Sequence, residues 1–106
     1  MKNIELTYEN KTYILEFDRA SVKKLEQNGF DLNSITTQPV TMLPKLYKGA
    51  FLKHHPDISE EKAVEIISNI GNKEDFIQAL TELYIEPLNT LMSNTDKGNA
   101  SWKKTW

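Results

Sequence analysis

The sequence contains no cysteine, so disulfides, thiolate nucleophiles and cysteine-ligated zinc sites are excluded. No apolar run approaches the roughly 20 residues that a membrane-spanning helix needs. The first residues alternate polar and apolar side chains and lack the apolar stretch of a secretory signal. We therefore expect a soluble, intracellular protein with no membrane partner.

Positive charge is not in excess, and glycine and proline are scarce, at four residues each. The net charge of −2 and the pI near 5.7 argue against a nucleic-acid partner, whose phosphates would favour a basic surface. With 39% apolar and 26% charged residues, the 106-residue chain is typical of one globular core. We expect a single α+β domain over residues 1–92 and a flexible C-terminal tail over 93–106, where the composition becomes polar.

The first structural element is predicted to be a two-stranded β-hairpin within residues 2–17. Apolar and polar residues alternate over 4–8 and again over 13–17, on either side of a turn at Glu9, Asn10 and Lys11. Asn10 is expected to adopt a positive φ, which its short amide side chain tolerates.

Four helices, packed as a small bundle, are expected to follow the hairpin. Asp18 stands at an N-cap position before a first helix over residues 19–28, which Gly29 should end in the left-handed conformation. After a loop over 31–40, apolar residues with helical spacing over 43–54 predict a second helix, with Pro44 in its first turn. Ser59 should cap the third helix, and the fourth should cover residues 73–92 with a kink at Pro87.

Residues that could support catalysis or metal binding are few. His54 and His55 are adjacent, and adjacent side chains on a helix point about 100° apart, so the two rings cannot share a metal ion as an i, i+4 pair can. One packed ring and one exposed ring is the preferred interpretation. The acidic residues fall on the outer helix faces, and neither a nucleophile elbow nor a phosphate-binding glycine loop is present. We expect no catalytic residue, no metal site and no cofactor.

Trp102 and Trp106, the two tryptophans of the chain, both lie in the expected tail, with Lys103 and Lys104 between them. Tryptophan is enriched at binding hot spots, and the four-residue spacing would place both rings on one side of a helical turn. Two interpretations remain open. The tail docks on a partner, or its rings pack back on the core of this domain.

Four segments of residues 8–92 resemble a family of small tail-region proteins of siphophages and prophages of Gram-positive bacteria, generally treated as tail assembly chaperones. These are strings of residues rather than a catalytic signature. They are Tyr13-Ile14-Leu15-Glu16-Phe17-Asp18-Arg19, Lys24-Leu25-Glu26 with Gly29-Phe30-Asp31, Gly49-Ala50-Phe51-Leu52-Lys53-His54-His55-Pro56, and Tyr84 with Glu86-Pro87-Leu88.

The resemblance implies a non-catalytic helper that binds the tape measure protein, and tail tube subunits as a second class of partner, before the tail polymerises. It carries no established functional residues, so the expected binding residues come from our reading of the apolar surfaces. A structural tail or connector subunit is the alternative, followed by a small nucleic-acid-binding regulatory module, and the oligomeric state stays open. The expected partner-binding residues are Tyr47, Phe51, Leu52, Tyr84, Pro87, Trp102 and Trp106.

Overall fold

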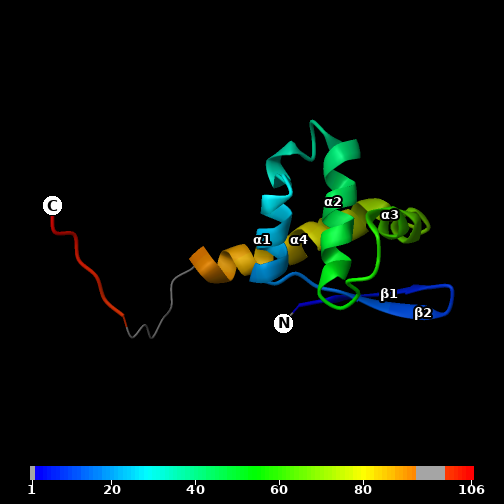
Figure 1. The fold of residues 1–106 in the computed structure, drawn as a ribbon, viewed down its shortest axis with the longest axis horizontal. Coiled ribbons are helices and arrows are strands. Elements are labelled where there is room, and N and C mark those ends of the chain that lie inside the picture. Colours follow the sequence, from blue (N-terminus) through cyan, green and yellow to red (C-terminus); the bar gives the residue numbers. More distant parts are fainter. Residues whose placement is uncertain (1, 93–99) are drawn as a thin grey trace.

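The computed structural model describes residues 2–92 and 100–106. A two-stranded hairpin precedes four α-helices, with one short 3-10 helix between the first two (Figure 1). This α+β order, with the four helices after the hairpin, confirms the predicted fold class. The bounds are β1 Ile4–Tyr8, β2 Lys11–Leu15, α1 Arg19–Gln27, η1 Leu32–Ser34, α2 Pro39–Leu52, α3 Glu60–Ser68 and α4 Lys73–Met92.

The hairpin is tighter than predicted. Its strands are antiparallel, and Tyr8 pairs with Lys11, so Lys11 belongs to β2 and only Glu9 and Asn10 form the loop. Both loop residues have positive φ, 51° for Glu9 and 64° for Asn10. A two-residue loop needs this left-handed geometry at both positions to match the twist of the strands. The prediction for Asn10 is confirmed, and Glu9 is an additional left-handed residue.

The structure confirms the three helix-end residues that were predicted from the sequence, namely the caps Asp18 and Ser59 and the left-handed Gly29. Asp18 accepts the backbone amide of Ser21 at 2.8 Å and caps α1. Gly29, just beyond α1, has φ 88°. Ser59 caps α3 by accepting the amide of Lys62 at 3.0 Å. Each cap satisfies an amide that the helix itself leaves unpaired.

The start of α2 was predicted wrongly. The helix begins at Pro39, so Pro44 lies inside it rather than in its first turn. Proline is well suited to the first helical position, because it has no amide hydrogen to lose there. The apolar pattern begins later only because the first turn is exposed, as at Val40. The helix also ends at Leu52, before the predicted stop at His55-Pro56, although His55 still donates its amide to Phe51.

The core lies where α2 crosses the other elements. Phe51, Leu15, Leu46, Ile66, Ile67 and Leu80 are its largest fully buried side chains, and they come from β2, α2, α3 and α4. The hairpin extends along one end of the helices, near the C-terminal end of α2 (Figure 1).

The expected tail over residues 93–106 is described only in its last part. Residues 93–99 lie outside the described residues, and residues 100–106 have no regular secondary structure. That last part extends away from the helices (Figure 1). No helix within residues 2–92 or 100–106 combines the length and the apolar character that crossing a membrane requires.

Candidate functional site

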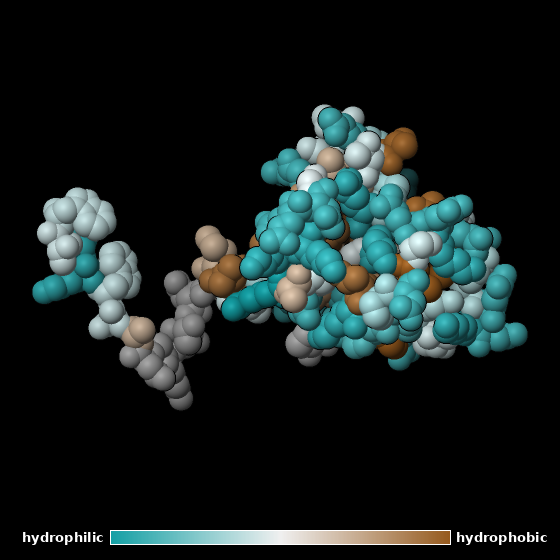
Figure 2. Space-filling model, in the orientation of Figure 1, coloured by the Kyte–Doolittle hydropathy of each residue, from teal (hydrophilic) through white to brown (hydrophobic). Residues whose placement is uncertain are grey.

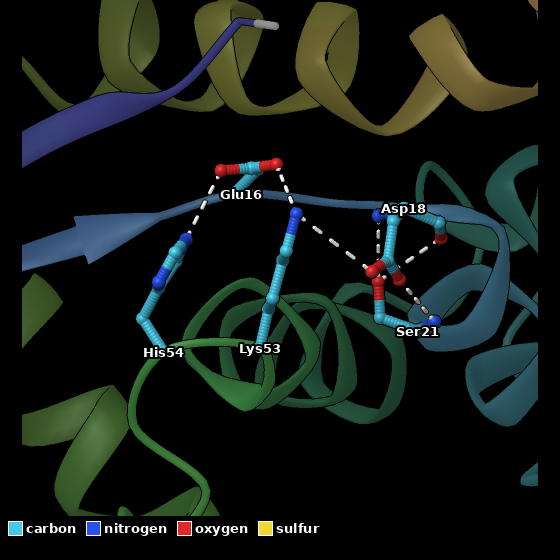
Figure 3. Close-up of polar contacts among 5 residues, drawn as sticks. All are labelled: Glu16, Asp18, Ser21, Lys53 and His54. Atoms are coloured by element: carbon cyan, nitrogen blue, oxygen red, sulfur yellow. Dashed lines mark hydrogen bonds and ion pairs between the residues drawn. The ribbon is translucent and has the colours of Figure 1, made fainter.

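A buried carboxylate joins the end of the hairpin to the end of α2 (Figure 3). Glu16 directly follows β2, and its side chain is almost inaccessible to solvent. One carboxylate oxygen accepts a hydrogen bond from Lys53 Nζ at 2.5 Å, and the other lies 3.0 Å from His54 Nε2. The backbone amide of Glu16 also donates to the carbonyl of Ala50 at 3.1 Å. Three contacts therefore hold this residue against the last turns of α2.

The N-cap of α1 belongs to the same polar cluster. Asp18 Oδ2 lies 3.9 Å from Lys53 Nζ, while Asp18 and Ser21 form a reciprocal capping box (Figure 3). The pKa of Asp18 is lowered chiefly by the hydrogen bond from the Ser21 amide. The cluster therefore connects the N-terminus of α1 to the C-terminus of α2.

The pKa shifts of Glu16 and Lys53 are those of a stable ion pair. The hydrogen bond from Lys53 lowers the pKa of Glu16 most, the hydrogen bond from His54 adds to it, and burial opposes both. The same hydrogen bond raises the pKa of Lys53. A general base needs a raised carboxyl pKa, and a lysine nucleophile needs a lowered one, so both shifts have the wrong direction for those roles. We interpret the cluster as a structural clamp.

His55 makes a second link between α2 and the hairpin. Its Nε2 accepts the backbone amide of Ile14 at 3.0 Å, which requires the unprotonated form of that nitrogen. Its ring packs edge-on against Tyr13, with a centroid separation of 5.1 Å. Burial lowers the pKa of His55, with the charges of His54 and Lys11 as further causes. Sequence reasoning predicted one packed and one exposed ring, but missed that each ring has a polar partner in the N-terminal segment.

The described residues contain no group of three or more His, Cys, Asp or Glu side chains arranged to hold a metal ion. No buried side-chain nitrogen or oxygen among them lacks a hydrogen-bond partner. Buried polar groups aimed at a ligand would be the usual mark of a built small-molecule site.

An apolar groove runs between α1 and the C-terminal half of α4. It consists of two cavities of about 230 and 260 Å³, which share Arg19 and Pro87 and therefore adjoin. We call the pair of cavities the α1/α4 groove. The apolar side chains that line it are Phe17, Val22, Leu83, Pro87, Leu88 and Leu91.

The groove continues onto an exposed apolar helix end. Leu91 is 60% exposed and Met92 is 81% exposed. The last turns of α4 project beyond α1 (Figure 1), and hydrophobic residues gather there next to the grey trace (Figure 2). A helix of 20 residues is about 30 Å long, whereas the 9 residues of α1 cover about 14 Å. This difference in length is the sequence signal that could have located the uncovered end.

The structure separates the seven expected binding residues into two groups. Tyr47, Phe51 and Tyr84 are buried in the core, so their rings are not available to a partner on this surface. Tyr84, for example, packs edge-on between Phe17 and Phe30, with centroid separations of 5.3 and 5.1 Å. Their apolar spacing reflects the inner face of each helix.

The other four expected residues lie at the surface or beside a cavity. Leu52 is half-buried beside a separate cavity between α1 and α2. Pro87 lies in the floor shared by both cavities of the α1/α4 groove. Trp102 and Trp106 are 86% and 90% exposed, and the described part of the tail is not helical. Leu88 and Leu91, which also line the groove, were not among the expected binding residues.

The fold and the groove define a small α+β domain with an open apolar surface and satisfied polar clusters. The chain belongs to the family described as a domain of unknown function, DUF5055, whose model matches residues 1–106. No curated protein and no solved structure matches the chain significantly.

Proposed function

We propose that this protein is a non-catalytic, chaperone-like binding protein that holds an apolar helix of its partner in the α1/α4 groove. The observation that carries the proposal is the continuity of the groove with the exposed Leu91 and Met92. Large apolar side chains that gather at an open groove mark an interaction surface more often than single exposed residues do. A groove between two helices is also the usual receptor for an amphipathic helix.

The dimensions of the groove favour a helical ligand with a few apolar anchors. The two adjoining cavities could each receive one side chain, and neighbouring anchors on a helix are three or four residues apart. Burying one Leu or Phe side chain contributes about 1.5–3 kcal/mol, so two or three anchors contribute roughly 3–9 kcal/mol before the cost of association. Micromolar binding, about −8.2 kcal/mol, therefore needs further contacts along the helix beside the anchors. Reversible binding of this strength suits a helper that must later release its partner.

The partner that we propose is the tape measure protein of a phage tail, with tail tube subunits as a second partner, in the cytoplasm of the bacterial host. Its identity is supported by the resemblance described above. A tape measure protein contains long apolar helices that need cover until the tail assembles, and the α1/α4 groove offers such cover.

The test is co-expression of the full chain with the adjacent tape measure protein, followed by co-purification and titration. We expect a complex, and we expect Leu91→Lys to weaken it at least tenfold, or about 1.4 kcal/mol, by placing a charge in the apolar contact. Val40→Lys is the control, because Val40 is also an exposed apolar residue, at 88%, but lies at the start of α2. Equal binding by both variants would reject the groove, and no complex at micromolar concentration would reject the function.

A structural tail or connector subunit is the second candidate. The hairpin supports it, because β1 is an edge strand that another copy could extend, whereas the outer edge of β2 is partly occupied by His55, which accepts the Ile14 amide. Light scattering separates the two candidates: a defined ring favours the structural subunit, and a monomer or small oligomer favours the helper.

A further inference from the structure

The tail presents two large aromatic side chains to solvent. Trp102 and Trp106 are 86% and 90% exposed, and three residues separate them. An indole ring buries a large apolar area when it finds a site, and its N–H needs only one polar neighbour. Two such rings so close together are a pair of apolar anchors without a receptor in the extended arrangement of Figure 1.

The α1/α4 groove has two adjoining receptors of the right size. A cavity of about 150 Å³ accommodates benzene, and scaling from six ring atoms to the nine of indole gives about 225 Å³. The cavities measure about 230 and 260 Å³. Because they share Arg19 and Pro87, they lie beside each other, and two rings four residues apart can occupy adjacent sites when residues 102–106 form a helical turn on docking. Each cavity can therefore take one indole.

The connection between groove and tail is long enough. Ten residue steps separate Met92 from Trp102 (102 − 92), which corresponds to a reach of at most about 35 Å. Leu88 and Leu91 line the groove within about one helical turn of Met92. The sequence between Met92 and Trp102 is therefore long enough for the rings to reach the groove.

The short connection between Met92 and Trp102 also decides whether the tail docks in the groove of its own chain or in that of a second copy. A short connection keeps the tail at an effective concentration on the order of millimolar near its own groove, well above micromolar protein. The charges do not decide the matter, because the two cavities are lined by three cationic side chains, those of Lys2, Arg19 and Lys23, and by three anionic ones, those of Asp18, Glu26 and Glu86. Ring size and tether length carry the argument.

We propose that residues 100–106 dock in the α1/α4 groove of their own chain, with Trp102 and Trp106 occupying the two cavities. In the structure described above, residues 100–106 lie outside the α1/α4 groove, which is the undocked arrangement. An external helix would then compete with the tail for the groove, and only this competition rests on the proposed function. Docking of the tail stands or fails without any partner.

Tryptophan fluorescence of the full chain tests the proposal directly, because both tryptophans of the protein lie in the tail. We expect blue-shifted emission and protection from acrylamide relative to free tryptophan amide, at all dilutions from micromolar concentration downwards. Leu91→Lys should shift the emission to that of exposed tryptophan and increase quenching several-fold. Val40→Lys should leave both signals unchanged.

Three outcomes would overturn the proposal. Emission and quenching like those of free tryptophan amide in the native chain would show that the tail does not dock. Protection that Leu91→Lys leaves intact would place the rings at another site. Protection that disappears on dilution, together with a fall in molar mass by light scattering, would show that the groove of a second copy is the receptor.

A second measurement links tail and partner. Replacing both rings in the full chain, Trp102→Ser with Trp106→Ser, should strengthen binding of the tape measure protein several-fold, because its competitor is gone. Weaker binding by this variant would show that the tail contacts the partner instead of competing with it. Failure of the complex in every variant would count against the proposed function alone, since the fluorescence result needs no partner.

Discussion

Replacing Glu16 by alanine removes the residue through which the hairpin end is fastened to α2. The carboxylate makes two charge-assisted hydrogen bonds, to Lys53 and to His54. Its side chain is 7% exposed, whereas that of Lys53 is 31% exposed. Water can therefore partly replace the lost partner at Lys53, which limits the cost of truncation.

The magnitude follows from these contacts. A hydrogen bond to a charged group contributes about 1.5–3 kcal/mol, and the partial exposure of both partners favours the lower end of that range. Two such bonds predict a loss of about 3 kcal/mol for Glu16→Ala. Glu16→Gln keeps the volume, and its amide oxygen can still accept from Lys53, but its amide nitrogen cannot accept the hydrogen bond from His54, so we expect about half that loss. Both variants should fold, because domains of this size have about 5–15 kcal/mol of stability.

Urea unfolding followed by circular dichroism at neutral pH measures these losses, and a double-mutant cycle isolates the pair. We expect a coupling energy of about 1–2 kcal/mol between Glu16→Ala and Lys53→Met. The exposed pair Lys62 and Glu65, 2.7 Å apart on α3, is the matched control, with an expected coupling below about 0.5 kcal/mol. Equal coupling in the two pairs would refute the clamp.

Three further predictions concern the hairpin and its contacts with the helices. The pKa of His55 is lowered, so the unfolded chain binds the proton more tightly, and stability should fall as pH decreases below about 6.5. His55→Gln, whose amide oxygen can accept the same strand amide, should flatten this dependence in urea unfolding at a series of pH values, and an unchanged dependence in this variant would contradict the assignment to His55. Gly49→Ala should lower the thermal unfolding midpoint, because the new Cβ would lie 2.5 Å from Leu25 Cδ1. Overpacking costs about 1–3 kcal/mol, which exceeds the gain of about 1 kcal/mol in helix propensity. A higher midpoint would show that the Leu25 side chain moves into the adjoining cavity. Glu9→Asn should raise stability by roughly 0.5 kcal/mol, since asparagine tolerates the φ of 51° better, and an unchanged midpoint would contradict a strained turn.

Features determined by neighbouring residues were predictable from the sequence. The hairpin, the caps at Asp18 and Ser59 and the span of α4 each depend on side chains and amides a few residues apart. These features can be predicted because a capping oxygen or an alternating apolar pattern acts on residues close to it in the sequence. The start of α2 was missed because its exposed first turn has no apolar spacing to reveal it.

Tertiary structure alone decided which apolar residues are covered and which polar residues meet. Helical spacing places Phe51 and Tyr84 on an apolar face but does not say whether that face meets the core or a partner, and packing buries both. Glu16 and Lys53 are 37 residues apart in the sequence, so no local pattern could join them. The α1/α4 groove likewise exists because α4 is longer than its neighbour α1. Only the way in which the two helices cross shows which turns of α4 remain uncovered.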